Sequence, residues 1–259
     1  MMISAKCGAL RERYLQTFVA RTYAEHTEQY LLYSFQSDEL HHLFLSDLVQ
    51  GTTLLEVGSG PSVNFACLAS IRFKDIVLSD LVEDSRLELK KWLSNTEDAI
   101  DWTLRAQQIA ALEGFSNINE GATKIAERTR RAVRKVVPCD VLTPGVLPEE
   151  DRDTFDVVLS CNCLEGATVD HESFQRALFN MAALVKPGGL LVLAGVGGIS
   201  SYEVGRESFP MVDLTDCVIK HSMSNAGLQV KAFSTRMYDG PNVEAHGKRF
   251  GFVVAAQKC

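Results

Sequence analysis

The chain has 259 residues, of which 46% are hydrophobic and 23% charged, and its mean hydropathy is +0.00. These are the proportions of a globular protein, and they exclude a chain that is mainly disordered, collagen-like or coiled coil. The 33 acidic and 26 basic residues give a formal net charge of −7. We therefore expect no nucleic acid partner, because DNA and RNA are polyanions. No apolar run approaches the roughly 18–20 residues of a membrane span, so we expect no membrane partner either.

The seven cysteines bear on the cellular compartment of the protein. Their number is odd, and the first residues show no long apolar stretch before a small-residue cleavage site. This combination is typical of reduced thiols and predicts a cytoplasmic protein. Cys161 and Cys163 are separated by one residue, which is not the spacing of a CxxC zinc site. We therefore expect no bound metal.

Hydrophobic periodicity predicts helices followed by alternating strands and helices. Residues 10–33 and a stretch from residue 38 to residue 50 have a helical pattern. Seven short apolar runs predict strands, at residues 53–57, 76–78, 136–137, 155–160, 190–194, 229–233 and 250–255. Helical patterns separate the first five runs and also occupy residues 213–225. This order predicts an α/β fold with a mostly parallel sheet between helices and an antiparallel hairpin at its edge. No linker divides the chain, so we expect one domain over residues 1–259, with residues 1–50 as a helical cap.

Glycine and aspartate residues lie at the ends of the first three predicted strands. Gly58 and Gly60 come directly after the first strand, Asp80 ends the second, and Asp140 and Val141 follow the third. The carboxyl ends of parallel strands form the ligand crevice of an open α/β sheet. The glycines let a ligand lie against the backbone, and Asp80 can accept hydrogen bonds from ribose hydroxyls. Asp140 can accept from an adenine amino group while the Val141 N–H donates to a ring nitrogen.

This pattern fits both NAD and S-adenosylmethionine, and three residues favour the second. Val63 stands where the dinucleotide fingerprint G-x-G-x-x-G has its third glycine. Pro61 removes a backbone N–H where a pyrophosphate would need donors. Glu56 would repel a pyrophosphate but suits a ligand that carries an ammonium and a sulfonium group. The sequence therefore predicts S-adenosylmethionine as the cofactor.

Several segments resemble the small-molecule amine N-methyltransferases, which comprise the nicotinamide, phenylethanolamine and indolethylamine N-methyltransferases. The similar segments cover nearly the whole chain and include residues 14–18, 55–61, 73–80, 88–93, 138–141, 184–189 and 200–202. The resemblance implies a Rossmann-like class I methyltransferase fold: a mostly parallel seven-stranded sheet with helices on both faces and an N-terminal helical cap. It also implies a monomer.

The resemblance implies a set of cofactor-binding residues. Tyr23, Ser59 and Ser62 would bind the methionine carboxylate, and Gly58 and Gly60 would pass beneath the methionine. Asp80 would hold the ribose, and Asp140 with Val141 the adenine. Glu56, Ser85 and Cys161 complete this set, with Cys161 near the methionine amino group.

For the methyl acceptor, the resemblance implies Glu165, Gly195, Tyr202, Met211 and Tyr238. Glu165 would be the catalytic residue, either as a base that takes a proton from the amine or as a group that only orients a cationic acceptor. Gly195 stands where some relatives have an acid, Met211 where the nicotinamide enzyme has a serine, and Glu28 where that enzyme has a tyrosine. These replacements predict a less polar acceptor wall and poor methylation of nicotinamide.

The leading hypothesis is transfer of a methyl group from S-adenosylmethionine to a nitrogen of a small amine or aza-aromatic compound. One alternative is the same chemistry on an oxygen, a sulfur or a protein side chain. A second alternative is a binding protein of the same fold without turnover. In the leading hypothesis the N-terminal helices close over the cofactor and exclude water, because Tyr23 is distant in sequence from the strands it must reach.

Overall fold

The structure is a computed structural model, and it describes residues 4–27, 32–238 and 249–259. Three helices form the N-terminal cap: α1 (Ala5–Thr17), α2 (Ala20–Thr27) and α3 (Leu32–Leu45). The Ser4 hydroxyl begins α1 by accepting a hydrogen bond from the Cys7 N–H. The cap is more divided than the two predicted helical stretches, because the chain is extended at Phe18, between α1 and α2. Glu28 lies outside the described residues.

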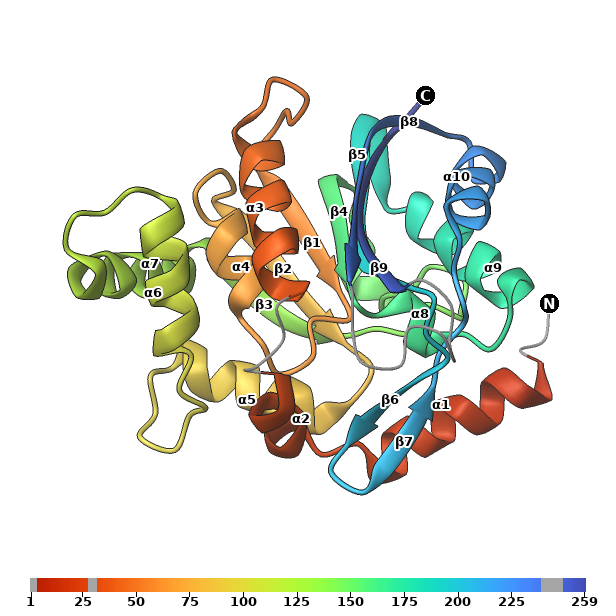
Figure 1. The fold of residues 1–259 in the computed structure, drawn as a ribbon, viewed down its shortest axis with the longest axis horizontal. Coiled ribbons are helices and arrows are strands. Elements are labelled where there is room, and N and C mark those ends of the chain that lie inside the picture. The colour runs from red at the N-terminus through yellow and green to blue at the C-terminus, as the bar shows by residue number, and fades with distance from the viewer. Residues whose placement is uncertain (1–3, 28–31, 239–248) are drawn as a thin grey trace.

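Seven strands form one sheet in the order β3-β2-β1-β4-β5-β9-β8 (Figure 1). They are β1 (Thr53–Val57), β2 (Asp75–Asp80), β3 (Val133–Pro138), β4 (Phe155–Cys161), β5 (Val185–Gly197), β8 (Leu228–Tyr238) and β9 (Arg249–Lys258). The first five pair in parallel, whereas β9 runs antiparallel to both β5 and β8. The predicted fold class, with its antiparallel edge hairpin, is confirmed.

Helices cover both faces of this sheet, as the alternation of buried side chains along β1 requires. Leu54 packs in the cluster that includes residues of α3, α4, α6 and α7, whereas Leu55 and Val57 pack in the cluster that includes α9 and α10 (Figure 1). The helices after the cap are α4 (Asn64–Ala69), α5 (Glu83–Leu93), α6 (Thr103–Leu112), α7 (Ile118–Ala132), α8 (Leu164–Ala167), α9 (His171–Ala182) and α10 (Asp216–Asn225), with a short 3₁₀ turn at Glu149–Asp151. Within the described residues, no helix is both long and apolar enough to cross a bilayer.

Two further features of the fold differ from the sequence-based expectations. A second, two-stranded sheet of β6 (Ser201–Val204) and β7 (Glu207–Pro210) was not predicted, although Gly205 at φ +62° provides its turn. The predicted helix at residues 171–185 ends earlier, at Ala182, and the Lys-Pro-Gly-Gly motif lies inside β5 rather than before it. A side chain at Gly189 would come within 2.7 Å of the Asp156 carbonyl oxygen, so the strands approach too closely there for any other residue.

Candidate active site

A cavity with an empty volume of about 780 Å³, partly open to solvent, lies where strands β1 to β4 end. The loops after these strands form its floor, and α1, α2 and β6 contribute side chains that cover it. Seven residues singled out from the sequence line this cavity: Tyr23, Gly58, Gly60, Asp80, Asp140, Val141 and Tyr202. The cavity thus brings together residues that are distant in the sequence, such as Tyr23 of α2 and Tyr202 of β6.

The glycine loop is held in a conformation that only glycine adopts easily. Gly58 and Gly60 have φ values of +73° and +59°. A Cβ atom on Gly58 would lie 2.1 Å from the Cys163 sulfur, so a side chain is excluded there. The N–H groups of Gly58 and Ser59 both donate to the Ser79 carbonyl, at 2.8 and 2.9 Å. The loop is therefore fixed against the end of β2, with its backbone exposed to the cavity.

The two acids after β2 and β3 are held by backbone N–H groups. Asp80 accepts hydrogen bonds from the N–H groups of Gly60 and Val82, both at 2.8 Å. Burial raises the pKa of Asp80, and these two hydrogen bonds counteract part of that rise. Asp140 accepts from the Leu142 N–H at 3.0 Å, and its other oxygen lies 2.7 Å from Nε of Arg11. Each carboxylate thus has a fixed orientation at the rim of the cavity.

Beneath the glycine loop, buried polar atoms have no hydrogen-bond partner among the described residues. They are Oε2 of Glu56, Oγ of Ser59 and Nδ2 of Asn64. Burial, and next the charge of Asp80, raise the pKa of Glu56 to about 8. Unpartnered polar atoms are rare in buried sites and are costly unless a ligand satisfies them. A cationic group bound above Glu56 would ionise this carboxyl, which fits the ammonium of S-adenosylmethionine and not a pyrophosphate.

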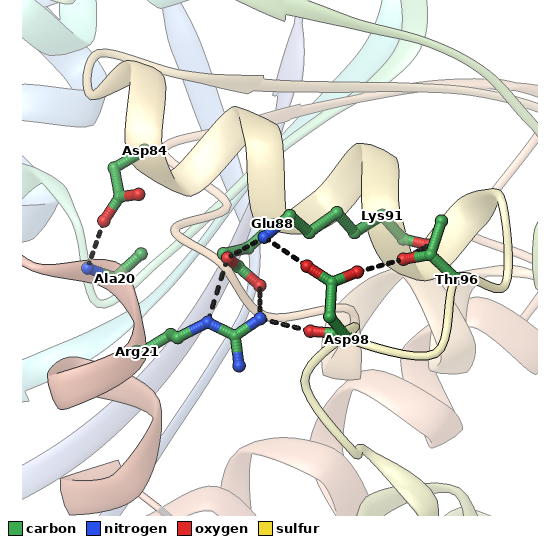
Figure 2. A network of polar contacts seen from close by, with 7 residues as sticks. All are labelled: Ala20, Arg21, Asp84, Glu88, Lys91, Thr96 and Asp98. Atoms are coloured by element: carbon green, nitrogen blue, oxygen red, sulfur yellow. Dashed lines mark hydrogen bonds and ion pairs between the residues drawn. The ribbon is translucent and has the colours of Figure 1, made fainter.

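Helix α2, which carries Tyr23, is fastened to α5 by a polar network that Figure 2 shows. Arg21 forms two hydrogen bonds to the carboxylate of Glu88, at 3.1 and 2.9 Å, and Lys91 approaches the same carboxylate at 3.0 Å. The Ala20 N–H donates to Asp84 at 2.9 Å. Glu88 is only 4% exposed, and these two cations pair with its buried carboxylate. The network holds the first turn of α2 against α5.

Aromatic side chains from the cap and from the small sheet form one wall of the cavity. Tyr14, Phe18, Tyr23 and Tyr202 all line it, and the buried Phe209 packs behind, stacked on Tyr14 with ring centroids 4.5 Å apart. The hydroxyl groups of Tyr14 and Tyr202 lie 2.9 Å apart. Burial raises the pKa of both phenols, so both are neutral at physiological pH. The aromatic wall is therefore uncharged.

Glu165 and Gly195 lie side by side but do not line the cavity. Glu165 is 2% exposed, and its Oε1 accepts a hydrogen bond from the Val196 N–H at 3.1 Å. Burial raises the pKa of Glu165 to about 7. A Cβ atom on Gly195 would lie 2.8 Å from that same Oε1 and 2.7 Å from the ring of Phe252. This crowding explains why an acidic side chain is incompatible with position 195 while Glu165 keeps this conformation.

The other predicted site residues also lie outside the cavity lining. Ser59, Ser85 and Cys161 are buried at the ends of strands or in the first turn of α5. Ser62 accepts a hydrogen bond from the Asn64 N–H at 3.2 Å. Met211 donates its N–H to the Ser200 carbonyl at 2.7 Å, directly after β7. Tyr238 ends β8, next to residues 239–248, which lie outside the described residues.

Comparison with known proteins decides the family. A sequence model described as the NNMT/PNMT/TEMT family matches residues 9–258. The chain belongs to this family. The family resemblance inferred from the sequence motifs is therefore confirmed, and the match extends from the cap to the last strand of the sheet.

Curated members of the NNMT/PNMT/TEMT family match most of this chain. The indolethylamine N-methyltransferase of Oryctolagus cuniculus is 34% identical over 252 residues, which are 95% of this chain and 92% of that protein. The nicotinamide N-methyltransferase of Homo sapiens is 33% identical over 231 residues, which are 86% of each chain. The phenylethanolamine N-methyltransferase of Homo sapiens is 31% identical over 198 residues, which are 76% of this chain and 69% of that protein.

Solved structures that are more distant in sequence share the fold. The N-methyltransferase NodS of Bradyrhizobium japonicum, in complex with S-adenosyl-L-homocysteine, is 15% identical with a TM-score of 0.54 and covers 98% of this chain and 99% of its own. The magnesium protoporphyrin IX methyltransferase of Synechocystis PCC 6803, with bound S-adenosylmethionine, is 11% identical with a TM-score of 0.58 and covers both chains fully. These likenesses support the methyltransferase fold.

Several cavity residues of this NNMT/PNMT/TEMT family member were not predicted as site residues. They are Arg11, Tyr14, Phe18, Leu81, Val82, Cys139, Leu142, Asn162, Cys163, Gly166 and Ala167. Five of them come within two residues after the end of a strand, namely Leu81, Val82, Cys139, Asn162 and Cys163. These positions could have been identified from the sequence, because the strand ends were predicted. Arg11 and Tyr14 had no such signal, because they lie in a helix that reaches the cavity only through tertiary packing.

Proposed function

We propose that this protein transfers a methyl group from S-adenosylmethionine to a nitrogen of a small amine or aza-aromatic acceptor. Its membership of the NNMT/PNMT/TEMT family supports this function. The relatives at 31–34% identity are named for methyl transfer to nitrogen of nicotinamide, indolethylamine and phenylethanolamine.

A buried carboxyl two residues before Gly58, outside the cavity lining, carries the choice of cofactor. Glu56 is 1% exposed, and Oε2 of its carboxyl has no hydrogen-bond partner among the described residues. An ammonium group would pair with this carboxyl, while Asp80 and Asp140 would accept from ribose and adenine. Gly58 and Gly60 both line the cavity, and the methionine part of the ligand would lie against their backbone.

The residues of the chain would act mainly by positioning. S-adenosylmethionine supplies the methyl group, activated by the positive charge on its sulfur. Tyr202 would border the acceptor with uncharged surface and exclude water from it, while Tyr23 would bind the methionine carboxylate of the cofactor. Alignment of two reactants of this kind contributes on the order of 7 kcal/mol or more to lowering the barrier. Glu165, with a pKa of about 7, would accept a proton from an alkylamine or orient it.

A methyl-transfer screen tests this function. Radiolabelled S-adenosylmethionine is incubated with the protein and with panels of alkylamines, azines, phenols and thiols. We expect labelled product from amines or azines only. Labelling confined to phenols, thiols or protein side chains would replace this function with the first alternative, and cofactor binding without any product would replace it with a binding protein.

We further propose that residues 1–259 form one catalytic domain, with residues 1–50 as its cap, and that the protein is a cytoplasmic monomer. The continuous helical and strand packing between cap and sheet supports the single domain. The seven free cysteines fit a reducing compartment. Size-exclusion chromatography with light scattering tests the monomer, for which we expect a mass near 28.6 kDa.

A further inference from the structure

The two N-terminal helices that cover the cavity are attached to the rest of the molecule in different ways. Helix α2 is bound at its first turn to α5, where the Ala20 N–H donates to Asp84 at 2.9 Å (Figure 2). Arg21, the next residue, forms two hydrogen bonds to the buried carboxylate of Glu88. Helix α5 is itself packed in the core beside β2 and β3. These contacts fix α2 to the layer of helices on the sheet.

Helix α1 spans the cavity between two attachments. Two of its 13 residues are buried, so most of its surface does not contribute to the core. On the side of the proposed cofactor site, Nε of Arg11 donates to Oδ2 of Asp140 at 2.7 Å. On the other side, Tyr14 stacks on Phe209, and its hydroxyl lies 2.9 Å from that of Tyr202. Helix α1 is thus joined to the loop after β3 by an ion pair and to the small sheet by aromatic rings.

The chain between α1 and α2 can absorb a movement of α1. Phe18 ends α1 in an extended conformation, with φ −75° and ψ 121°. Val19 follows and is 49% exposed, and the contacts of α2 with α5 begin only at Ala20. Residues at the ends of helices are where hinge movements commonly occur. A rotation at Phe18 and Val19 would therefore move α1 without breaking the contacts between α2 and α5.

The carboxylate that holds α1 is also the one expected to bind adenine. Oδ1 of Asp140 accepts from the Leu142 N–H at 3.0 Å, and Oδ2 accepts from Arg11. Each carboxylate oxygen can accept two hydrogen bonds, so capacity remains for the amino group of an adenine. The side chains of Arg11 and Asp140 are 33% and 15% exposed, which places the ion pair where the cavity meets solvent. Nη1 of Arg11 also approaches Glu12 of the same helix at 3.0 Å.

We propose that α1 is a gate over the cofactor end of the cavity and that the ion pair of Arg11 with Asp140 is its latch. The latch is closed in the free protein and in the complex, and it opens each time the cofactor enters or the demethylated product leaves. It therefore slows entry and release by the same factor and leaves the affinity unchanged. Arg11 acts through Asp140 and α1, so it is a positioning residue. The inference rests on the proposed function, since it takes S-adenosylmethionine and S-adenosylhomocysteine as the ligands of this cavity.

The two rate constants for S-adenosylhomocysteine test the inference. Surface plasmon resonance on the full-length protein gives the association and dissociation rate constants, and calorimetry gives the dissociation constant independently. In Arg11→Gln we expect both rate constants to rise about fivefold, as the loss of one partly exposed charged hydrogen bond allows. The dissociation constant should stay within about twofold of its natural value. A residue that only adds binding surface would change the dissociation rate and the affinity together.

Two variants and a change of salt separate the latch from a general effect on folding. Arg11→Lys keeps the positive charge and should restore much of the slow exchange. Arg131→Gln removes an exposed arginine of α7 that pairs with Glu127, and it should leave both rate constants unchanged. Salt screens a partly exposed ion pair. Raising sodium chloride from about 50 mM to about 1 M should therefore speed entry and release in the natural protein and have little effect in Arg11→Gln.

Every outcome of these measurements bears on the latch. Unchanged rate constants in Arg11→Gln, or a faster release with an equal loss of affinity, overturn the inference while the proposed function stands. Faster exchange in Arg131→Gln as well would also overturn it. Exchange that follows the expected pattern, together with no methyl transfer to any acceptor, overturns the proposed function alone. A natural protein that does not bind S-adenosylhomocysteine overturns both.

Discussion

The two ends of the cavity are built in different ways. At the proposed cofactor end, the polar groups come from short loops after β1, β2 and β3, and local backbone N–H groups orient the carboxylates of Asp80 and Asp140. At the proposed acceptor end, the groups come from segments that are distant in sequence, such as Tyr14 of α1 and Tyr202 of β6. The structure of the proposed cofactor end depends on local chain geometry, whereas that of the proposed acceptor end depends on how the cap packs on the sheet.

The largest expected effect comes from removing helices α1 and α2 of the cap. Deletion of residues 1–30 removes Arg11, Tyr14, Phe18 and Tyr23 from the cavity but leaves α3 packed in the core through Phe35, Leu40 and Phe44. We expect methyl transfer to fall by roughly 100-fold or more, because the aligned and water-free site is lost. Circular dichroism should still show a folded sheet with a cooperative thermal transition. Normal turnover by the truncated protein would show that the cap does not complete the site.

The sequence predicted these two ends unequally. Gly58, Gly60, Asp80 and Asp140 were placed correctly at the cavity, because strand ends and the residues after them can be read from hydrophobic runs and glycines. The β6–β7 hairpin was missed, since its strands have four residues each and little periodicity.

The acceptor end could not be predicted in the same way. Glu165 was expected in the amine pocket, but its carboxyl turns toward the Val196 N–H, and this orientation depends on tertiary packing. Asn162, which lines the cavity, was not predicted as a site residue. Its side chain pairs with that of Gln36, 126 positions away, and no local pattern indicates such a pair.

The two buried glutamates provide a second comparison, through the pH dependence of stability. Burial raises the pKa of Glu56 to about 8 and that of Glu165 to about 7. A carboxyl whose pKa is higher in the folded than in the unfolded state stabilises the fold at low pH, and this contribution is lost as pH rises through the folded pKa. We therefore expect the free energy of unfolding of the ligand-free protein to fall between about pH 5 and pH 8, by on the order of 3 kcal/mol for each group.

Urea unfolding across this pH range, in the natural protein and two variants, tests this expectation. Glu56→Gln and Glu165→Gln should each flatten the profile, whereas the exposed Glu172→Gln should not. Saturating S-adenosylhomocysteine should remove only the contribution of Glu56 to the pH dependence of the unfolding free energy, because the ammonium group of the ligand would pair with that carboxyl. A profile that is flat without any substitution would contradict the raised pKa values.

A smaller effect is expected from the ribose site at the cofactor end. Asp80→Asn should weaken binding of S-adenosylhomocysteine by about 1.5–3 kcal/mol, the range for losing hydrogen bonds to a charged acceptor. Part of this loss would come from the loop itself, because Asp80 also holds the Gly60 N–H. Calorimetry measures the affinity, with the exposed Asp153→Asn as the control. An unchanged dissociation constant in Asp80→Asn would rule out the ribose assignment.

The smallest effect concerns Glu165 and depends on the acceptor. In Glu165→Gln we expect kcat for a primary alkylamine to fall about tenfold, since an alkylamine must lose a proton and general acid–base groups contribute at least this much. Turnover of a pyridine should change less than about twofold, because its nitrogen loses no proton. Affinity for S-adenosylhomocysteine should be unchanged, as Glu165 lies beside Gly195 and away from the loops after β2 and β3.

Steady-state kinetics between pH 6 and pH 9 measure these differences. For the alkylamine, the kcat of the natural protein should rise through about pH 7, because Glu165 ionises there. Equal losses on both acceptors would mean that Glu165 supports the end of β5 and has no part in proton transfer.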